Sequence, residues 1–178
     1  MLPNLITGVR LLALVPLYVL VAHGGEASRG AALALFLLAG ASDIADGWLA
    51  RRLGLGSAFG AFLDLVADRL LTLAAVAGLI AAGRLPGGWA AAGLVLVVRD
   101  LAVAGLNETF AGLGIRVTPA EKAKVALQFL GLALLIAPGW AEAQLWIGRG
   151  ALGLAALLAA LLTLGYVRRA LGPSAGAA

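Results

Sequence analysis

Six long apolar runs divide this chain and leave few residues between them. They cover roughly residues 5–22, 30–50, 57–82, 89–110, 119–137 and 143–167 of 178, and Gly, Pro and charged residues separate them. Roughly 20 apolar residues are needed to cross a bilayer core of about 30 Å. The chain therefore has room for six spans and for no separate soluble domain, so we expect one transmembrane domain over residues 1–178.

Composition supports lipid as the solvent of these runs. Hydrophobic residues make up 62% of the chain and charged residues 12%, and the mean hydropathy of +1.03 is far above that of soluble proteins. Backbone groups in lipid must bond to one another, and the runs lack the alternation of strands, so all six are predicted to be helices of an all-α bundle. The 13 basic residues are scattered rather than gathered in a stripe, which argues against nucleic acid as a partner.

The basic residues divide unevenly between the two ends of an alternating six-span bundle. One end holds Arg51, Arg52, Arg116, Lys122, Lys124, Arg168 and Arg169, and the other holds Arg29, Arg84 and Arg149. Cytoplasmic loops carry the excess of Lys and Arg, so the first end and both termini are predicted to face the cytoplasm. The first run has no basic leader and carries Arg10 inside it, so it is interpreted as a mature span rather than a signal peptide. We expect a multi-pass protein of the inner, cytoplasmic membrane.

Four aspartates lie within two of the apolar runs, where a charged group needs a reason to be. Asp43 and Asp46 come near the end of the second run, and Asp64 and Asp68 lie in the third. Residues three or four apart share one face of a helix, so each pair projects together and the four carboxylates can converge. The alternative is a structural ion-pair network with the nearby arginines.

Converging carboxylates repel one another in a medium of low dielectric unless cations compensate them. The chain has no cysteine and one histidine, so a metal site here must use oxygen ligands. Such ligands select hard cations, and we expect Mg²⁺, or Mn²⁺ in its place, with one or two ions per site. Gly47, Ala50 and Gly60 keep side-chain bulk low nearby, and Arg51 offers a planar fork for phosphate oxygens, which predicts a diphosphate ligand.

These residues follow one another as D-x2-D-G-x2-A-R-x8-G-x3-D-x3-D, from Asp43 to Asp68. The pattern resembles the signature of the CDP-alcohol phosphatidyltransferase family at all eight of its fixed positions. That family is similarly built from six transmembrane helices, with the signature across the second and third helices and facing the cytoplasm. The resemblance implies an enzyme that works in the lipid bilayer and transfers a phosphatidyl group from CDP-diacylglycerol to a small alcohol, with release of CMP.

The resemblance also implies a role for each residue of the site. Asp43, Asp46 and Asp64 are expected to hold the metal ions. Asp68 is expected to take the proton of the acceptor hydroxyl and also to be near a metal. Contacts to the CDP group are assigned to Gly47, Ala50, Arg51, Gly60, Asn4 and Thr7. A pocket for the acceptor phosphate is assigned to Arg10, Arg99, Arg116, Lys122 and Lys124. A homodimer is also an expectation taken from the family.

Two segments bear on the choice of acceptor within the family. Residues 2–7 with Arg10, and residues 59–68, look most like bacterial phosphatidylglycerophosphate synthases, whose acceptor is sn-glycerol 3-phosphate. Arg99-Asp100 stands where those synthases usually read Arg-Glu, so phosphatidylglycerol, as in a cardiolipin synthase, and inositol phosphate stay open as acceptors. An ion transporter and an intramembrane prenyltransferase are the alternatives from other classes. The acids of the second and third runs cluster toward one face, which favours a dead-end site over a conduction path.

Several of the basic residues also have simpler interpretations. Arg99 and Asp100 lie near the middle of the fourth run, where an ion pair with each other or with another helix is as reasonable as phosphate binding. Lys122 and Lys124 are also explained by the positive-inside rule or by contact with anionic lipid.

Overall fold

The chain folds into helices joined by short connections. The computed structural model describes residues 2–53, 58–109, 118–139 and 141–171, with side chains left out at 2–7, 43–51, 53, 58–59, 61, 106–109 and 167–171. The helices are α1 (Leu2–His23), α2 (Glu26–Leu53), α3 (Ala58–Ala81), α4 (Gly88–Thr109), α5 (Pro119–Ile136) and α6 (Glu142–Leu171). These described ranges contain no strand, and each helix covers one of the predicted runs. The all-α prediction is therefore confirmed.

Local sequence explains where the helices begin and end. The Thr118 hydroxyl accepts a hydrogen bond from the Glu121 amide at 3.2 Å and so caps α5, while Pro119 occupies the first turn, where its missing N–H costs nothing. Gly83 and Gly87 adopt φ of 70° and 55° in the turn between α3 and α4, and Gly139 adopts φ of 82° after α5. Side chains rarely tolerate these positive values, so glycine is needed at each turn.

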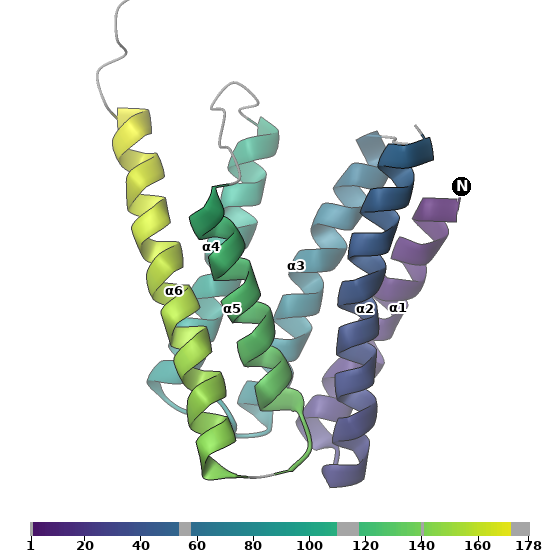
Figure 1. Ribbon diagram of the computed structural model, residues 1–178, viewed down its shortest axis with the longest axis vertical. Coiled ribbons are helices and arrows are strands. Elements are labelled where there is room, and N and C mark those ends of the chain that lie inside the picture. The colour runs from purple at the N-terminus through teal and green to yellow at the C-terminus, as the bar shows by residue number, and fades with distance from the viewer. Residues whose placement is uncertain (1, 54–57, 110–117, 140, 172–178) are drawn as a thin grey trace, which may run out of the picture.

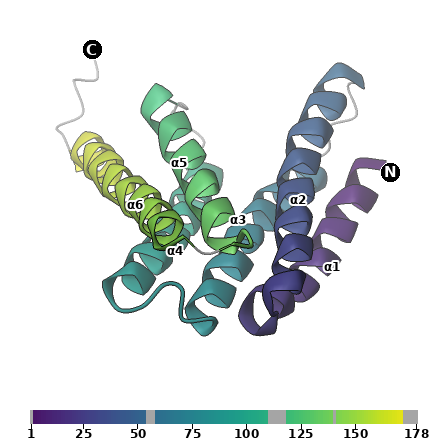
Figure 2. The same cartoon turned by 60° about the horizontal axis from the view of Figure 1, so that its bottom comes forward.

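The helices run alternately up and down and form two groups, α1–α3 and α4–α6 (Figure 1). Within the groups, α1 packs closely against α3 and α5 packs closely against α6. The groups diverge toward the end at which α2, α4 and α6 finish, and a view from another angle shows the same separation between α2 and α5 (Figure 2). Helices joined by short connections pack against each other, α1 with α2, α3 with α4 and α5 with α6.

The surface of the bundle is unusually apolar. Leu17, Leu79 and Leu152 are fully buried in the common core, but Leu12 and Val98 are 77% and 64% exposed on the outside. Within the described residues, two stretches are long and apolar enough to cross a bilayer, Gly88–Gly105 and Glu142–Tyr166, with mean hydropathies of 1.5 and 1.9. Exposed aliphatic side chains of this kind suit a lipid environment.

The end opposite the divergence is held closed by side chains that bond to backbone carbonyls. Arg84, in the turn after α3, donates to the Leu135 carbonyl at the end of α5. The Nε atom of Arg149 donates to the Arg84 carbonyl at 2.9 Å, and the Gln144 amide donates to the Leu134 carbonyl at 2.8 Å. These bonds satisfy carbonyls that a helix end leaves open. Burial, with a smaller contribution from Arg29, lowers the pKa of Arg84 to about 10, so its guanidinium stays protonated at neutral pH.

Close contact between α5 and α6 depends on glycine, which gives a testable prediction. A Cβ atom at Gly131 would lie 2.9 Å from the Gly148 carbonyl oxygen and 3.0 Å from the Leu152 nitrogen. Because both neighbours are backbone atoms, Gly131→Ala must push the helices apart, and we expect a loss of about 1–3 kcal/mol in unfolding free energy. Thermal unfolding of the detergent-solubilised protein measures this loss.

The matched control for this prediction is Gly150→Ala on α6, since a Cβ atom at Gly150 meets nothing within 4 Å. Alanine favours helix over glycine, so this variant should melt at or slightly above the wild-type temperature. Equal melting temperatures for Gly131→Ala and the wild type would show that the helices do not approach as closely as described.

Candidate active site

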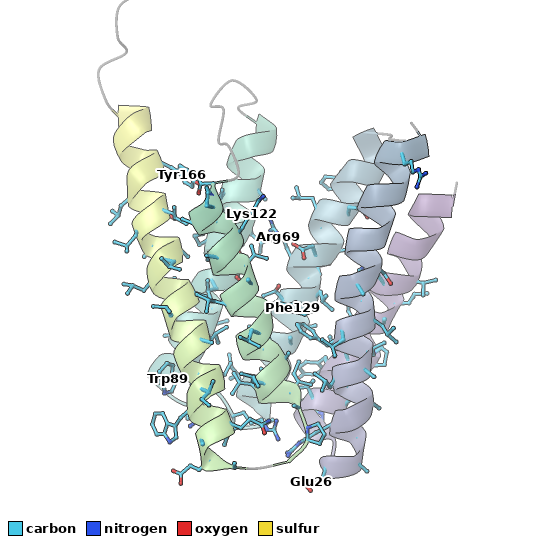
Figure 3. All side chains as sticks on the ribbon, in the orientation of Figure 1. Glu26, Arg69, Trp89, Lys122, Phe129 and Tyr166 are labelled. Atoms are coloured by element: carbon cyan, nitrogen blue, oxygen red, sulfur yellow. The ribbon has the colours of Figure 1, made fainter. Side chains whose placement is uncertain are left out.

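A cavity of about 890 Å³ lies between the two groups of helices. Helices α2 and α3 form one side, and α4, α5 and α6 form the other. Arg69, Lys122 and Tyr166 lie toward the end at which the groups diverge, whereas Glu26 and Trp89 lie at the opposite end (Figure 3). The cavity therefore brings charged groups from distant parts of the sequence to one end of the bundle.

The inner part of the cavity is apolar. The rings of Phe36 on α2 and Phe129 on α5 stack with their centroids 4.7 Å apart and their planes inclined by 22°. Gly40 makes room for this contact, because a Cβ atom there would lie 2.6 Å from Cε2 of Phe129. Leu71 and Leu132 are buried beside the rings. The stacked rings thus form an apolar floor beneath the charged part of the cavity.

Asp68 stands on the α3 side of the cavity and pairs with its neighbour Arg69, which also lines the cavity. The Thr72 hydroxyl donates to the Asp68 carbonyl at 3.4 Å and accepts from the Gln128 amide of α5 at 3.4 Å. Asp64 is half-buried on α3, four residues before Asp68. Residues four apart share a helix face, but only Asp68 of the two lines the cavity.

The first half of the signature lies near the C-terminus of α2, which ends at Leu53. The end of α2 and the start of α3 lie at the same end of the bundle, the end toward which the two groups of helices diverge (Figure 1). Asp43, Asp46, Gly47, Ala50 and Arg51 belong to this helix, but their side chains lie outside the described ones. The described side chains alone contain no group of three metal-binding residues. The convergence of all four carboxylates therefore stays a prediction.

A polar network joins α4, α5 and α6 on the other side of the cavity. Its members are Arg99, Asp100, Glu121, Lys124, Thr163 and Tyr166. Arg99 donates through Nη2 to Oε1 of Glu121 at 2.6 Å and through Nη1 to Oδ1 of Asp100 at 3.0 Å. Lys124 donates to the same Asp100 oxygen at 2.6 Å. Each of the two carboxylates is therefore close to both cations, since Lys124 Nζ lies 3.8 Å from Glu121 Oε2.

Helix α6 completes this network with two hydroxyl groups. The Tyr166 hydroxyl donates to Glu121 Oε1 at 2.9 Å, and Arg99 Nε donates to the Thr163 hydroxyl at 3.0 Å. The Arg99 guanidinium carbon also lies 5.8 Å from the centre of the Tyr166 ring, within the range of a cation–π contact. Side-chain exposure is 9% for Arg99 and 14% for Glu121, so these charges are largely removed from solvent.

Only some of the predicted phosphate-binding residues line the cavity. Arg99, Lys122 and Lys124 line the cavity, whereas Arg10 is 3% exposed on α1 and does not belong to the described cavity wall. Arg116 lies outside the described residues, and so do the side chains of Asn4 and Thr7. Gly60 is half-buried on α3, one turn before Asp64.

Glu121 and Tyr166 were missed by reasoning from the sequence. The spacing from Thr118 to Glu121 has the form of a helix-start motif, which indicates where α5 begins but not what the carboxylate binds. Tyr166 lies in an apolar run, and nothing near it in the sequence points to a partner 45 residues earlier. The clearest signal of this network in the sequence was Arg99, for which an ion pair with another helix was one of the two interpretations.

The comparisons with known proteins agree with one another on a single family. The family model for CDP-alcohol phosphatidyltransferase matches residues 1–165. The chain is similar to a CDP-diacylglycerol–glycerol-3-phosphate 3-phosphatidyltransferase of Pseudomonas fluorescens, with 39% identity over 144 residues, or 76% of this chain and 71% of the relative. It is similar to a probable phosphatidylglycerophosphate synthase of Mycobacterium tuberculosis, with 35% identity over 178 residues, or 96% of this chain and 81% of the relative. It is also similar to a CDP-diacylglycerol–glycerol-3-phosphate 3-phosphatidyltransferase of Escherichia coli, with 33% identity over 168 residues, or 91% of this chain and 88% of the relative.

Proposed function

Because this chain belongs to the CDP-alcohol phosphatidyltransferase family, we propose that it transfers the phosphatidyl group of CDP-diacylglycerol to sn-glycerol 3-phosphate, giving phosphatidylglycerophosphate and CMP. The observation that carries this proposal is the complete signature from Asp43 to Asp68 in the sequence, whose last carboxylate, Asp68, lines a cavity shared with Lys122. The reaction is a step of phospholipid biosynthesis. It forms a bond from the acceptor oxygen to the β-phosphorus and breaks the bond from that phosphorus to CMP.

All six helices are proposed to cross the membrane as one domain, with both termini and the end at which the two groups of helices diverge on the cytoplasmic side. The alternation of the helices supports this topology (Figure 1). This topology places Arg52 and Lys122 toward the cytoplasmic end of the bundle. Arg149 and Arg84, two of the basic residues expected at the opposite end, are joined by a hydrogen bond. The protein is then a multi-pass protein of the inner membrane, and a homodimer is expected from the family.

The donor headgroup is proposed to bind where α2 meets α3. Close approach of the CDP group there depends on small residues, and its diphosphate needs a cation. The residues assigned to it are Gly47, Ala50, Arg51, Gly60, Asn4 and Thr7. The acyl tails need no dedicated pocket, because a donor embedded in the leaflet reaches the site by lateral movement.

The carboxylates that begin and end the signature fit a hard divalent cation. Asp64 and Asp68 present oxygen ligands from successive turns of α3, both half-buried rather than sealed from solvent. Together with Asp43 and Asp46 they are proposed to hold one or two Mg²⁺ or Mn²⁺ ions. Bound there, the ions would supply positive charge against the diphosphate as CMP leaves.

Asp68 is proposed to accept the proton of the attacking hydroxyl. It stands on the cavity wall, so an acceptor within the cavity can reach it. The adjacent Arg69 guanidinium pairs with the carboxylate at the cavity wall. The acceptor phosphate is proposed to lie toward α5 and to contact Lys122, with Arg116 as a further candidate. Arg99 and Lys124 line the same wall but are paired with Asp100 and Glu121, and Arg10 does not belong to the described wall.

An acceptor panel tests this function. Purified protein in detergent receives CDP-diacylglycerol, Mg²⁺ and one acceptor at a time, and CMP release is followed. We expect release with sn-glycerol 3-phosphate at least about a hundredfold faster than with phosphatidylglycerol or inositol phosphate, because a site built for one set of polar groups rejects analogues that leave them unpaired. Faster release with phosphatidylglycerol would identify a cardiolipin synthase, and faster release with inositol phosphate would identify an inositol-phosphate transferase. Either result would replace the proposed acceptor but keep the reaction.

A further inference from the structure

We propose that Glu121 is a positioning residue for the acceptor, which fixes the first turn of α5 and so holds Lys122 where the acceptor phosphate binds. This inference rests on the proposed function and adds to it a residue outside the signature and outside the predicted cationic set. Glu121 links three helices through one side chain. It accepts from Arg99 of α4 and Tyr166 of α6 while its own backbone belongs to α5.

The charges of the buried network balance. Two cations, Arg99 and Lys124, share two anions, Asp100 and Glu121, through contacts of 2.6 Å, 2.6 Å, 3.0 Å and 3.8 Å between charged atoms. Side-chain exposure of Asp100 is 6% and that of Lys124 is 3%. Taking one member of such a buried set away leaves an uncompensated charge, which is strongly destabilising.

A phosphate that took Arg99 or Lys124 for itself would leave Glu121 and Asp100 to share one cation. Lys122 avoids this cost, because it is exposed on the cavity wall and takes no part in the ion pairs among the described residues. The geometry therefore divides the cationic wall in two. Lys122 is the phosphate contact, and Arg99 and Lys124 act through Glu121 and Asp100 on the positions of the helices.

Sequence adjacency links the network to Lys122. Thr118 caps α5 by accepting from the Glu121 amide at 3.2 Å, and Pro119 stiffens the same turn. Both the backbone and the side chain of Glu121 are thus held, and Lys122 follows it directly in the chain. Because a helical turn moves as a unit, releasing the Glu121 side chain lets the Lys122 ammonium shift relative to Asp68 across the cavity.

Glu121→Gln tests the inference, since it keeps the shape of the side chain and removes its charge. We expect the KM for sn-glycerol 3-phosphate to rise about tenfold, while the KM for CDP-diacylglycerol stays within about twofold, because the donor is held by α2 and α3. Tyr166→Phe, which removes one hydrogen bond to Glu121, should raise the acceptor KM about threefold. Glu121→Asp keeps the charge on a shorter stem and should lie between Glu121→Gln and the wild type.

Glu142→Gln is the matched control, because Glu142 is an exposed carboxylate in the first turn of α6 at the far end of the bundle. Its KM values should equal those of the wild type. An unchanged acceptor KM for Glu121→Gln overturns the inference, whether or not kcat falls. If Glu121→Gln fails to fold, Tyr166→Phe decides by the same criterion.

A second readout separates this inference from the proposed reaction. Without donor, sn-glycerol 3-phosphate should protect the wild type from thermal unfolding, and Glu121→Gln should need about tenfold more of it for equal protection. Protection that weakens in the variant supports the inference even if no CMP is released, in which case the reaction itself is refuted. CMP release with a wild-type acceptor KM and undiminished protection in Glu121→Gln refutes the inference and leaves the reaction standing.

Discussion

Asp64→Asn and, separately, Asp43→Asn are expected to lower CMP release at least about a hundredfold while the protein still inserts and folds. Asparagine has nearly the same shape as aspartate but carries no charge, so it removes a cation ligand without removing bulk. Asp64 is half-buried on α3 and does not belong to the buried apolar core, so its replacement should leave packing intact. Initial rates at saturating donor and acceptor measure the effect.

The control for these variants is Glu26→Gln, a change of an exposed carboxylate in the first turn of α2 at the opposite end of the bundle. Its rate should match that of the wild type. Yield and melting temperature in detergent establish that the aspartate variants are folded. Full activity in folded Asp43→Asn or Asp64→Asn would show that the signature carboxylates do not hold an essential metal.

Removal of divalent cations by EDTA should silence the enzyme, and addition of Mg²⁺ or Mn²⁺ should restore it. The carboxylates proposed for the site have only oxygen to offer, and Mg²⁺ exchanges readily from such sites because it keeps several water ligands. CMP release before chelation, after chelation and after addition of each cation measures the effect. Rates after dialysis against EDTA should fall to the level of the Asp64→Asn variant.

Two further measurements make the chelation result specific. The melting temperature should change little on chelation if the cations serve chemistry rather than folding, since the described buried core is apolar and contains no carboxylate. Zn²⁺ should restore less activity than Mg²⁺, because the chain has no cysteine and one histidine. Turnover that survives thorough chelation would count against the proposed metal site as a whole.

The helices were predictable from the sequence because each is a long apolar run ended by glycine, proline or charge. The residues at which the helices end were less predictable. Helix α6 continues to Leu171, beyond the predicted end at 167, since Arg168, Arg169 and Ala170 are good helix formers although two of them are polar. Apolar pattern reports where a chain prefers lipid, whereas helical structure extends past that region wherever local propensity allows it.

The two sides of the cavity differed in how far sequence could predict them. The signature residues are close in the chain, so helical periodicity alone places Asp64 and Asp68 on one face of α3. Arg99 and Glu121 are 22 residues apart, and Glu121 and Tyr166 are 45 apart, so their pairing depends on how α4, α5 and α6 assemble. Spacing contains no information about that assembly. The crossing of the membrane by all six helices and the convergence of the four carboxylates both remain predictions.

The apolar floor of the cavity has a consequence for the cell as well as for the reaction. Among the described residues, the stacked Phe36 and Phe129 rings place apolar surface beneath the charged wall, and the Arg84 side chain bonds to the end of α5 on the far side. In the proposed topology, this apolar layer separates the site from the opposite side of the membrane. Such a layer opposes the passage of ions, so the membrane can stay energised while its own lipid is being made.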